Sequence, residues 1–216
     1  QIFASSGDSS VQLRRLGELM WIYIETLPST SWPISKNYWD TSTYDVVKAD
    51  PVKGEIDIDF DKNSKLQMRV EHGIKEASTE IFLIKINKLT NEIESDPEFI
   101  QGEMEKMIDY YADSLSNFSG TSLAAQNLNE MKKAKIFSEN GMTVISLDLN
   151  FDRAWSSVSK ALNAAQIVTN DRDRSNGTFY VSFAKEDERR FRLFGGRSSN
   201  ENSLNNEFGK DSQFEI

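Results

Sequence analysis

The sequence contains an internal repeat, which limits the possible folds more than its composition does. When Trp32 is placed over Trp155, an offset of 123 residues, the two stretches align without a gap. The aligned positions share apolar character, a turn glycine and aromatic anchors: Ile22 with Ile145, Ile24 with Leu147, Tyr44 with Ile167, Asp50 with Asp173, Gly54 with Gly177, Ile56 with Phe179, Ile58 with Val181 and Phe60 with Phe183. Because each copy of a repeat is usually one folding unit, the sequence predicts two related domains.

Each copy has the same plan: an alternating strand, a helix, and two strands joined by a tight turn. The first strands are "MWIYIETL" at 20–27 and "MTVISLDL" at 142–149, in which apolar residues recur at every second position. In the second copy, Phe151, Trp155 and Val158 share one helical face, and Asn150 is the predicted N-cap. The turns "DPVKG" and "DRSNG" end on glycine, which adopts the positive φ that such turns require.

The first copy continues beyond this shared plan. Two alternating strands, "KLQMRVEHG" and "STEIFLIKI", are followed by a helix that begins at Asp96-Pro97 and carries an apolar stripe. The pattern predicts an α+β fold in which each domain is an antiparallel sheet with helices packed on one face. The predicted organisation is an N-terminal tail at 1–18, a first domain at 19–117, a linker at 118–140, and a second domain at 141–216 with a polar loop at 184–212.

The second copy is shorter than the first. After Phe183 it has a polar loop and only the beginning of a strand, "QFEI". If the copies are equivalent, the second sheet lacks one strand and the helix that lies on it. We therefore expect the natural polypeptide to continue for roughly 40 to 60 residues after Ile216 and to finish with an amphipathic helix, or another chain to supply that cover.

The composition excludes several classes of protein. A net charge of -9 argues against a nucleic-acid partner, because phosphate contacts need clustered Lys and Arg. With no cysteine, the chain has neither disulfides nor thiolate metal sites. No apolar run approaches the roughly 18 residues of a transmembrane helix. The first ten residues do not resemble a signal peptide, so the protein is either cytosolic or exported with its signal removed upstream of Gln1.

Residues that could carry chemistry are sparse. His72 is the single histidine, and its place at a strand end favours a structural role over that of a catalytic base. The stretch "DIDFDKN" at 57–63 is superficially like a calcium loop, but its alternation is typical of a half-buried strand, and the loop glycine and glutamate are absent. Trp32 and Trp155 are predicted to lie in the core rather than in a ligand pocket. The sequence thus predicts no catalytic residue, no cofactor, no metal and no enzymatic activity.

The second copy is similar to the C-terminal domain of the BamC family, lipoproteins of the outer-membrane β-barrel assembly machinery. The resemblance rests on an "F-x-x-x-W" helix and a "D-x-x-R-S-x-G" turn, formed here by Phe151, Trp155, Asp171, Arg174, Ser175 and Gly177. The first copy is similar to the N-terminal domain of the family through Trp32, Tyr44, Asp50 and Gly54. The resemblance covers about residues 19–216 and implies two tandem helix-grip domains.

The resemblance also implies a function. The family is not enzymatic, so the chain is expected to be an accessory subunit that binds other proteins, with BamD and less directly BamA as partners. A lipid anchor upstream of Gln1 would hold it at the periplasmic face of the outer membrane. The alternative is a soluble pair of helix-grip domains that binds a small apolar ligand between helix and sheet.

Overall fold

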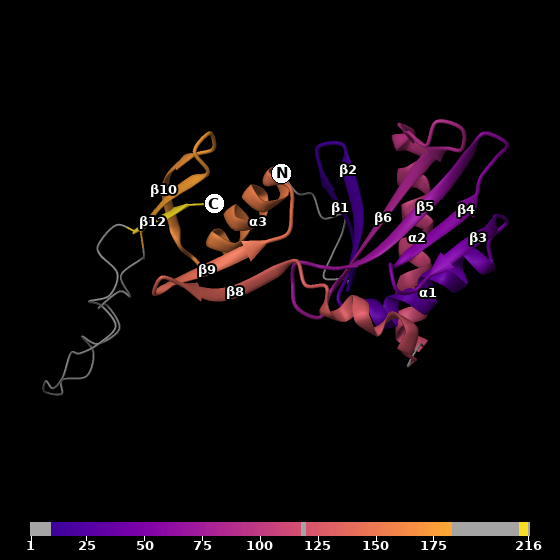
Figure 1. The fold of residues 1–216 in the computed structure, drawn as a ribbon, viewed down its shortest axis with the longest axis horizontal. Coiled ribbons are helices and arrows are strands. Elements are labelled where there is room, and N and C mark those ends of the chain that lie inside the picture. The colour runs from indigo at the N-terminus through magenta and orange to yellow at the C-terminus, as the bar shows by residue number, and fades with distance from the viewer. Residues whose placement is uncertain (1–9, 118–119, 183–211, 216) are drawn as a thin grey trace, which may run out of the picture. The chain divides into compact units, whose positions relative to one another are not determined.

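The computed structural model describes residues 10–117, 120–182 and 212–215 (Figure 1). The chain divides into two compact units, Gln1–Asp148 and Leu149–Ile216, and each is considered by itself. None of the helices in the described part of the chain is both long enough and apolar enough to cross a membrane.

The first unit is built on an antiparallel sheet with the strand order β1-β2-β6-β5-β4-β3, and β7 pairs with β6 at one end. Its strands are β1 (Val11–Leu16), β2 (Leu19–Ile24), β3 (Asp45–Asp50), β4 (Glu55–Asp59), β5 (Ser64–His72), β6 (Thr79–Asn87) and β7 (Ile93–Glu94). A separate two-stranded hairpin follows, formed by β8 (Ala134–Glu139) and β9 (Met142–Leu147). Strand β1 lies inside the stretch 1–18, which was predicted to be an N-terminal tail because its apolar pattern is weak. Pairing with β2 makes this segment part of the sheet.

Two helices, α1 (Pro28–Asp40) and α2 (Pro97–Asn117), pack on the sheet of the first unit, as Figure 1 shows. The predicted apolar stripe of α2 is buried, from Ile100 to Tyr111, and it meets the alternate residues of β2 that include Ile22 and Ile24. Trp39 of α1 is fully buried and donates from Nε1 to the sulfur of Met68. The other residues of β2, Trp21 and Tyr23, form a second, smaller cluster with Phe82.

The segment between α2 and the hairpin also packs on the first unit. It contains a 3₁₀ helix, η1 (Leu123–Glu130), which contacts α1 and β5 and buries Ala125 and Leu128 in the main core. Asn129 accepts a hydrogen bond from the backbone nitrogen of Ser29. The polar composition of 118–140 predicted a linker, whereas two of its apolar residues, Ala125 and Leu128, contact the core.

The second unit contains α3 (Phe151–Ala164), β10 (Val168–Asp173), β11 (Thr178–Ser182) and β12 (Ser212–Glu215), with the strands in the order β10-β11-β12. The predicted N-cap is confirmed, because the side chain of Asn150 accepts from the backbone nitrogen of Arg153 at 3.0 Å. Most of the predicted polar loop at 184–212 lies outside the described residues.

The repeat is visible in the structure at the predicted offset. β1, β2, β3 and β4 have the same bounds as β8, β9, β10 and β11 when 123 is added, and α3 starts 123 residues after α1. The β3–β4 and β10–β11 ladders even share a register shift at equivalent places, between Val46 and Lys48 and between Thr169 and Asp171. Within the described residues, the second copy has no counterpart of β6, β7 or α2.

The predicted α+β class with antiparallel sheets is confirmed, and the assignment of both copies to the helix-grip fold stays a proposal.

Candidate functional site

Trp155 of the motif lies in the centre of the second unit. The Trp155 ring is stacked on Phe179 with ring centroids 4.0 Å apart, and only 6% of Trp155 is exposed. Phe151 lies beside Trp155 but is 42% exposed. In the first copy, Trp32 is equally buried and belongs to the main core. Both tryptophans therefore lie in apolar cores, where they contribute to folding.

The remaining motif residues build the β10–β11 turn and connect it to α3. Asp173 accepts hydrogen bonds from the backbone nitrogens of Ser175 and Asn176, and Gly177 has a φ of +68°. Arg174 pairs with Asp152 in the first turn of α3 and lies over the Phe151 ring. The first copy makes the same turn, since Asp50 accepts from the backbone nitrogens of Val52 and Lys53 before Gly54. Asp171 is exposed and accepts from the backbone nitrogen of Arg172.

We expect the carboxyl of Asp173 to titrate below the ordinary value of 3.8, because hydrogen bonds from the backbone of Asn176 and then from the hydroxyl of Ser175 lower its pKa. The turn then gains stability from this carboxylate above its unfolded pKa and loses it as the pH falls through the lowered pKa. A carboxyl-carbon NMR titration measures this value. Ser175→Ala should raise the pKa of Asp173 part of the way back toward 3.8. A titration midpoint at or above 3.8 in the unmodified chain would contradict the turn geometry.

Gly54 is required by two separate constraints. Its φ is +71°, and a Cβ atom at this position would lie 2.2 Å from the carbonyl oxygen of Val70. Gly17 also has a positive φ of +61°, but its Cβ would meet nothing within 4 Å. Gly17→Ala should therefore cost only the left-handed backbone penalty of about 1–2 kcal/mol. Gly54→Ala should lower the free energy of unfolding, measured by urea denaturation, by clearly more than this. Equal losses of unfolding free energy in the two variants would show that the backbone around Val70 moves away without cost.

His72 and the acidic stretch at 57–63 make structural contacts. His72 is buried at the end of β5, with Nδ1 2.7 Å from the carbonyl oxygen of Gly73. In the acidic stretch, Asp57 bonds Lys65 and Gln67, while Asp61 accepts from two backbone nitrogens of the following turn. No group of three His, Cys, Asp or Glu side chains in the described part of the chain is placed to hold a metal ion. These carboxylates stabilise a strand and a turn.

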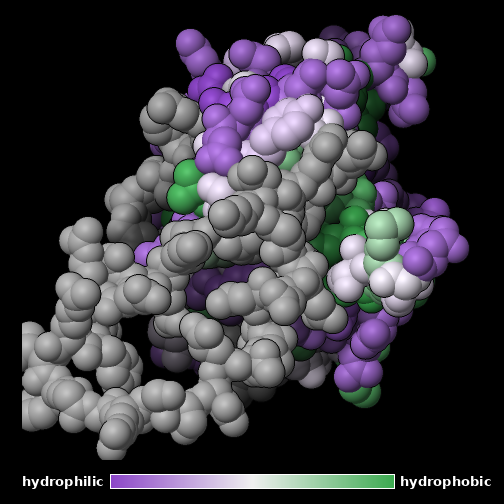
Figure 2. Space-filling model, turned by 90° about the vertical axis from the view of Figure 1, so that its left-hand side faces the viewer, coloured by the Kyte–Doolittle hydropathy of each residue, from purple (hydrophilic) through white to green (hydrophobic). Residues whose placement is uncertain are grey.

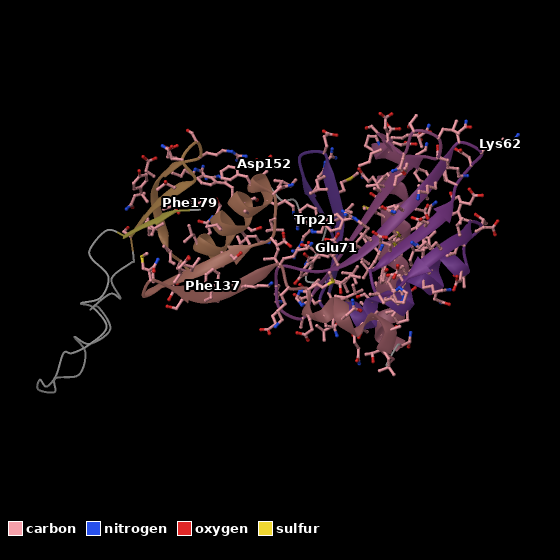
Figure 3. All side chains as sticks on the ribbon, in the orientation of Figure 1. Trp21, Lys62, Glu71, Phe137, Asp152 and Phe179 are labelled. Carbon is pink, nitrogen blue, oxygen red and sulfur yellow. The ribbon has the colours of Figure 1, made fainter. Side chains whose placement is uncertain are left out.

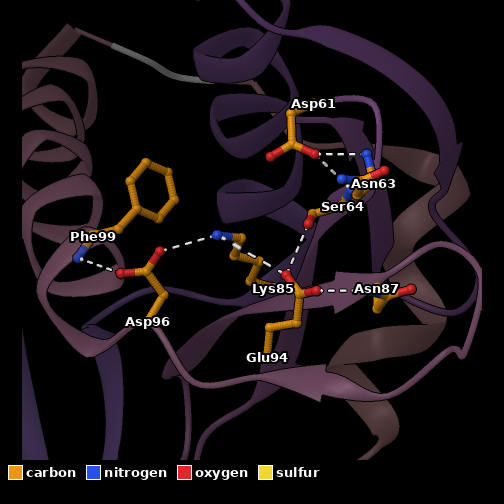
Figure 4. Close-up of polar contacts among 8 residues, drawn as sticks. All are labelled: Asp61, Asn63, Ser64, Lys85, Asn87, Glu94, Asp96 and Phe99. Carbon is orange, nitrogen blue, oxygen red and sulfur yellow. Dashed lines mark hydrogen bonds and ion pairs between the residues drawn. The ribbon is translucent and has the colours of Figure 1, made fainter.

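A polar cluster joins β5, β6 and β7 to the start of α2 (Figure 4). Lys85 lies 3.0 Å from Asp96 and 4.0 Å from Glu94, and the hydrogen bond with Asp96 raises the pKa of Lys85. Glu94 accepts from the Ser64 hydroxyl and the Asn87 amide, which lower its pKa. Asp96 also accepts from the backbone nitrogen of Phe99 at 3.4 Å, as a helix N-cap does. The cluster thus fixes where α2 begins.

A charged network covers the aromatic cluster on β2 and β6. The Lys133 ammonium lies 2.7 Å from Glu80 and 2.8 Å from Glu71, and it also lies over the Phe82 ring. The Arg14 guanidinium lies 3.4 Å from the centroid of the Tyr23 ring. Figure 3 labels Trp21 and Glu71 in this region. Because Lys133 directly precedes β8, the network holds the start of the hairpin on the first unit.

Side chains fill the space between the helices and the sheet of the first unit, where the alternative hypothesis places a ligand. Trp39, Met104, Met107 and Tyr111 are all fully buried there. A shallow groove of about 220 Å³ between α1 and α2 is lined by Pro33, Ile34, Asn37, Tyr110, Ser114 and Asn117. The observed packing does not favour a small apolar ligand in this unit.

The β8–β9 hairpin exposes large hydrophobic residues on both of its faces. Ile136 and Ile145 face each other across the ladder, and Phe137 and Met142 lie on the opposite face. All four are exposed, and Figure 3 labels Phe137 on this hairpin. Figure 2 shows hydrophobic residues (green) among hydrophilic ones on one side of the molecule. Exposed apolar residues gathered on one element are typical of an interaction surface.

Comparison with known proteins identifies the relatives of this chain. The profile described as "Outer membrane protein assembly factor BamC-like C-terminal domain" matches residues 133–207. An outer membrane protein assembly factor BamC from Thiobacillus denitrificans is 24% identical in an alignment that covers 82% of this chain and 57% of the relative. The predicted resemblance to the BamC family is confirmed. A second BamC, from Accumulibacter regalis, is 21% identical in an alignment that covers 81% of this chain and 55% of the relative.

The match places the motif in its structural context. The BamC-like segment includes β8, β9, α3, β10 and β11, so all motif residues from Phe151 to Gly177 lie inside it. The chain spans just over half the length of the BamC relatives it matches. The alternation of "MTVISLDL" predicted β9, but β8, the exposure of the hairpin and the Lys133 network were not predicted. The stretch "KIFSENGMTVISL", with Asn-Gly between two apolar segments, is a sequence signal for the hairpin.

Proposed function

We propose that this chain is a non-catalytic accessory subunit of the machinery that assembles outer membrane proteins, and that it acts through contacts with other proteins. The observation that carries the proposal is the similarity to two outer membrane protein assembly factors over about four fifths of the chain. The exposed apolar hairpin supports it, because such a surface suits a protein partner. The engagement of the acidic residues and His72 in local structure agrees with a role without catalysis.

The finer parts of the proposal follow from the family resemblance. BamD is the expected direct partner, and BamA is a less direct one. A lipid anchor upstream of Gln1 would hold the chain at the periplasmic face of the outer membrane. Two helix-grip domains, at 19–117 and 141–216, would then present their surfaces to the assembly.

A binding experiment with purified proteins tests this function. Immobilised chain is titrated with BamD and with the soluble part of BamA from the same bacterium, in biolayer interferometry, with the thermally unfolded chain as a control. We expect saturable binding to BamD with a Kd of about 10 μM or tighter, which corresponds to about 7 kcal/mol. Binding to neither partner, together with absence of the chain from the assembly complex isolated from membranes, would overturn the proposal.

A parallel titration addresses the ligand-binding alternative. A fatty acid is added to the purified chain while the fluorescence of its four tryptophans is followed. We expect no saturable change, because side chains already fill the core around Trp39 and Tyr111. Saturable stoichiometric binding would favour the alternative.

A further inference from the structure

The chain contains sulfur only in its methionines, because it has six methionines and no cysteine. All six lie among the described residues. Four of them are buried in the main core: Met20, Met68, Met104 and Met107. The other two lie at the surface, where Met131 is 60% exposed and Met142 is 66% exposed. The methionines therefore form two well-separated classes.

This division decides which thioethers a dissolved oxidant can reach. Hydrogen peroxide oxidises methionine to methionine sulfoxide. The sulfur attacks one peroxide oxygen, the O–O bond breaks as the S–O bond forms, and the peroxide is reduced to water. A buried sulfur has no room for the attacking peroxide, and the sulfur of Met68 also accepts a hydrogen bond from Trp39. In the folded chain, peroxide should therefore react with Met131 and Met142 before the four core methionines.

Met142 lies on an apolar face of the β8–β9 hairpin. Phe137 is opposite Val144 in the ladder, and Met142 is opposite Glu139, so Phe137, Val144 and Met142 share this face. The equivalent of Met142 in the first copy is Leu19, which is partly buried against the aromatic cluster on β2 and β6. The second copy thus has an exposed, oxidisable side chain where the first copy has a leucine that peroxide does not oxidise.

We propose that Met142 is a redox-modification site that controls the hairpin face it shares with Phe137. Oxidation places a polar sulfoxide among apolar side chains, and this weakens the binding of a protein partner to that face. Methionine sulfoxide reductases reverse the change, with a dithiol as the reductant that becomes a disulfide while water is released. The effect on binding rests on the proposed function, whereas the oxidation of Met142 does not.

Peptide mass spectrometry after treatment with hydrogen peroxide tests the oxidation step. In the folded chain, Met131 and Met142 should each gain one oxygen atom at least about tenfold faster than any of the four core methionines. In urea, all six should react at similar rates, because unfolding exposes every sulfur. If Met142 reacts no faster than Met68 in the folded chain, the proposal is wrong.

Two variants separate the exposed methionines in a binding experiment. After peroxide treatment, Met131→Leu carries a sulfoxide at Met142, and Met142→Leu carries one at Met131. Each variant is titrated with BamD and with the soluble part of BamA, before and after treatment. Oxidation should weaken binding by Met131→Leu about tenfold, and reductase with dithiothreitol should restore it, because a contact between apolar surfaces is lost and regained. Oxidation should not change the affinity of Met142→Leu.

The outcomes separate this inference from the proposed function. If oxidised Met131→Leu binds as tightly as before treatment, Met142 does not control this face. If the untreated chain binds neither partner, the proposed function fails and the role of this face in binding fails with it. The relative oxidation rates decide in either case whether Met142 is the modification site.

Discussion

Trp155→Ala is expected to unfold the second unit while the first unit stays folded. The buried apolar cluster of this unit consists of Trp155, Phe179 and Val181, with a few partly buried residues around it. Removing a buried tryptophan side chain costs about 3–5 kcal/mol. A domain of this size is stabilised by only about 3–10 kcal/mol in total, at about 0.05–0.15 kcal/mol per residue, so the loss removes a large part of its stability. The first unit has a separate and larger core, which this substitution does not touch.

Hydrogen exchange followed by mass spectrometry resolves the two units in one experiment. In Trp155→Ala, peptides from α3 and β11 should lose protection, and peptides from β5 and α2 should keep it. Trp32→Ala should lower the protection of peptides from β5 and α2 without abolishing it, since Trp32 lies in the larger core of the first unit, and it should leave α3 and β11 unchanged. Phe151→Ala is the control on the same helix, because Phe151 is half-exposed and should cost about 1 kcal/mol or less. Full protection of α3 in Trp155→Ala would show that the stack on Phe179 is dispensable.

Lys133→Met is expected to destabilise the first unit by about 3–5 kcal/mol, because it removes the ammonium from a buried ion pair while the carboxylate of Glu80 stays in place. Only 10% of the Lys133 side chain and 2% of the Glu80 side chain are exposed. Methionine keeps most of the side-chain volume, so the effect reports the lost charge rather than a cavity. Urea denaturation of the chain followed by tryptophan fluorescence measures it.

The neighbouring lysine is a matched control for this prediction. Lys132 pairs with Glu76 at 3.2 Å, but both side chains are well exposed, so Lys132→Met should change the stability by about 0.5 kcal/mol or less. Glu80→Gln combined with Lys133→Met removes both charges and should recover part of the loss. If Lys132→Met and Lys133→Met cost the same, the burial of the Lys133 network does not contribute to stability.

Much of the local structure follows from short-range patterns in the sequence. Period-two alternation predicted β2, β5 and β6, and the 3.6-residue stripe predicted α2 with its buried face. The capping residues Asn150 and Asp96 accept the backbone hydrogen bonds expected of them. The turn glycines Gly54 and Gly177 have positive φ. These features depend on residues close to each other in the chain, so a sequence pattern is sufficient to predict them.

Other features depend on contacts between residues that are distant in the sequence. The 3₁₀ helix η1 is anchored because Leu128 packs in a core made from other segments, and the polar sequence around Leu128 does not predict that contact. The charged network brings Lys133 to Glu80, 53 residues away. The exposure of Ile145 could not be predicted either, because Ile145 stands in the same alternating pattern as the buried Ile22. Alternation tells which side chains share a face of a strand, but the elements packed on that face decide whether it is core or surface.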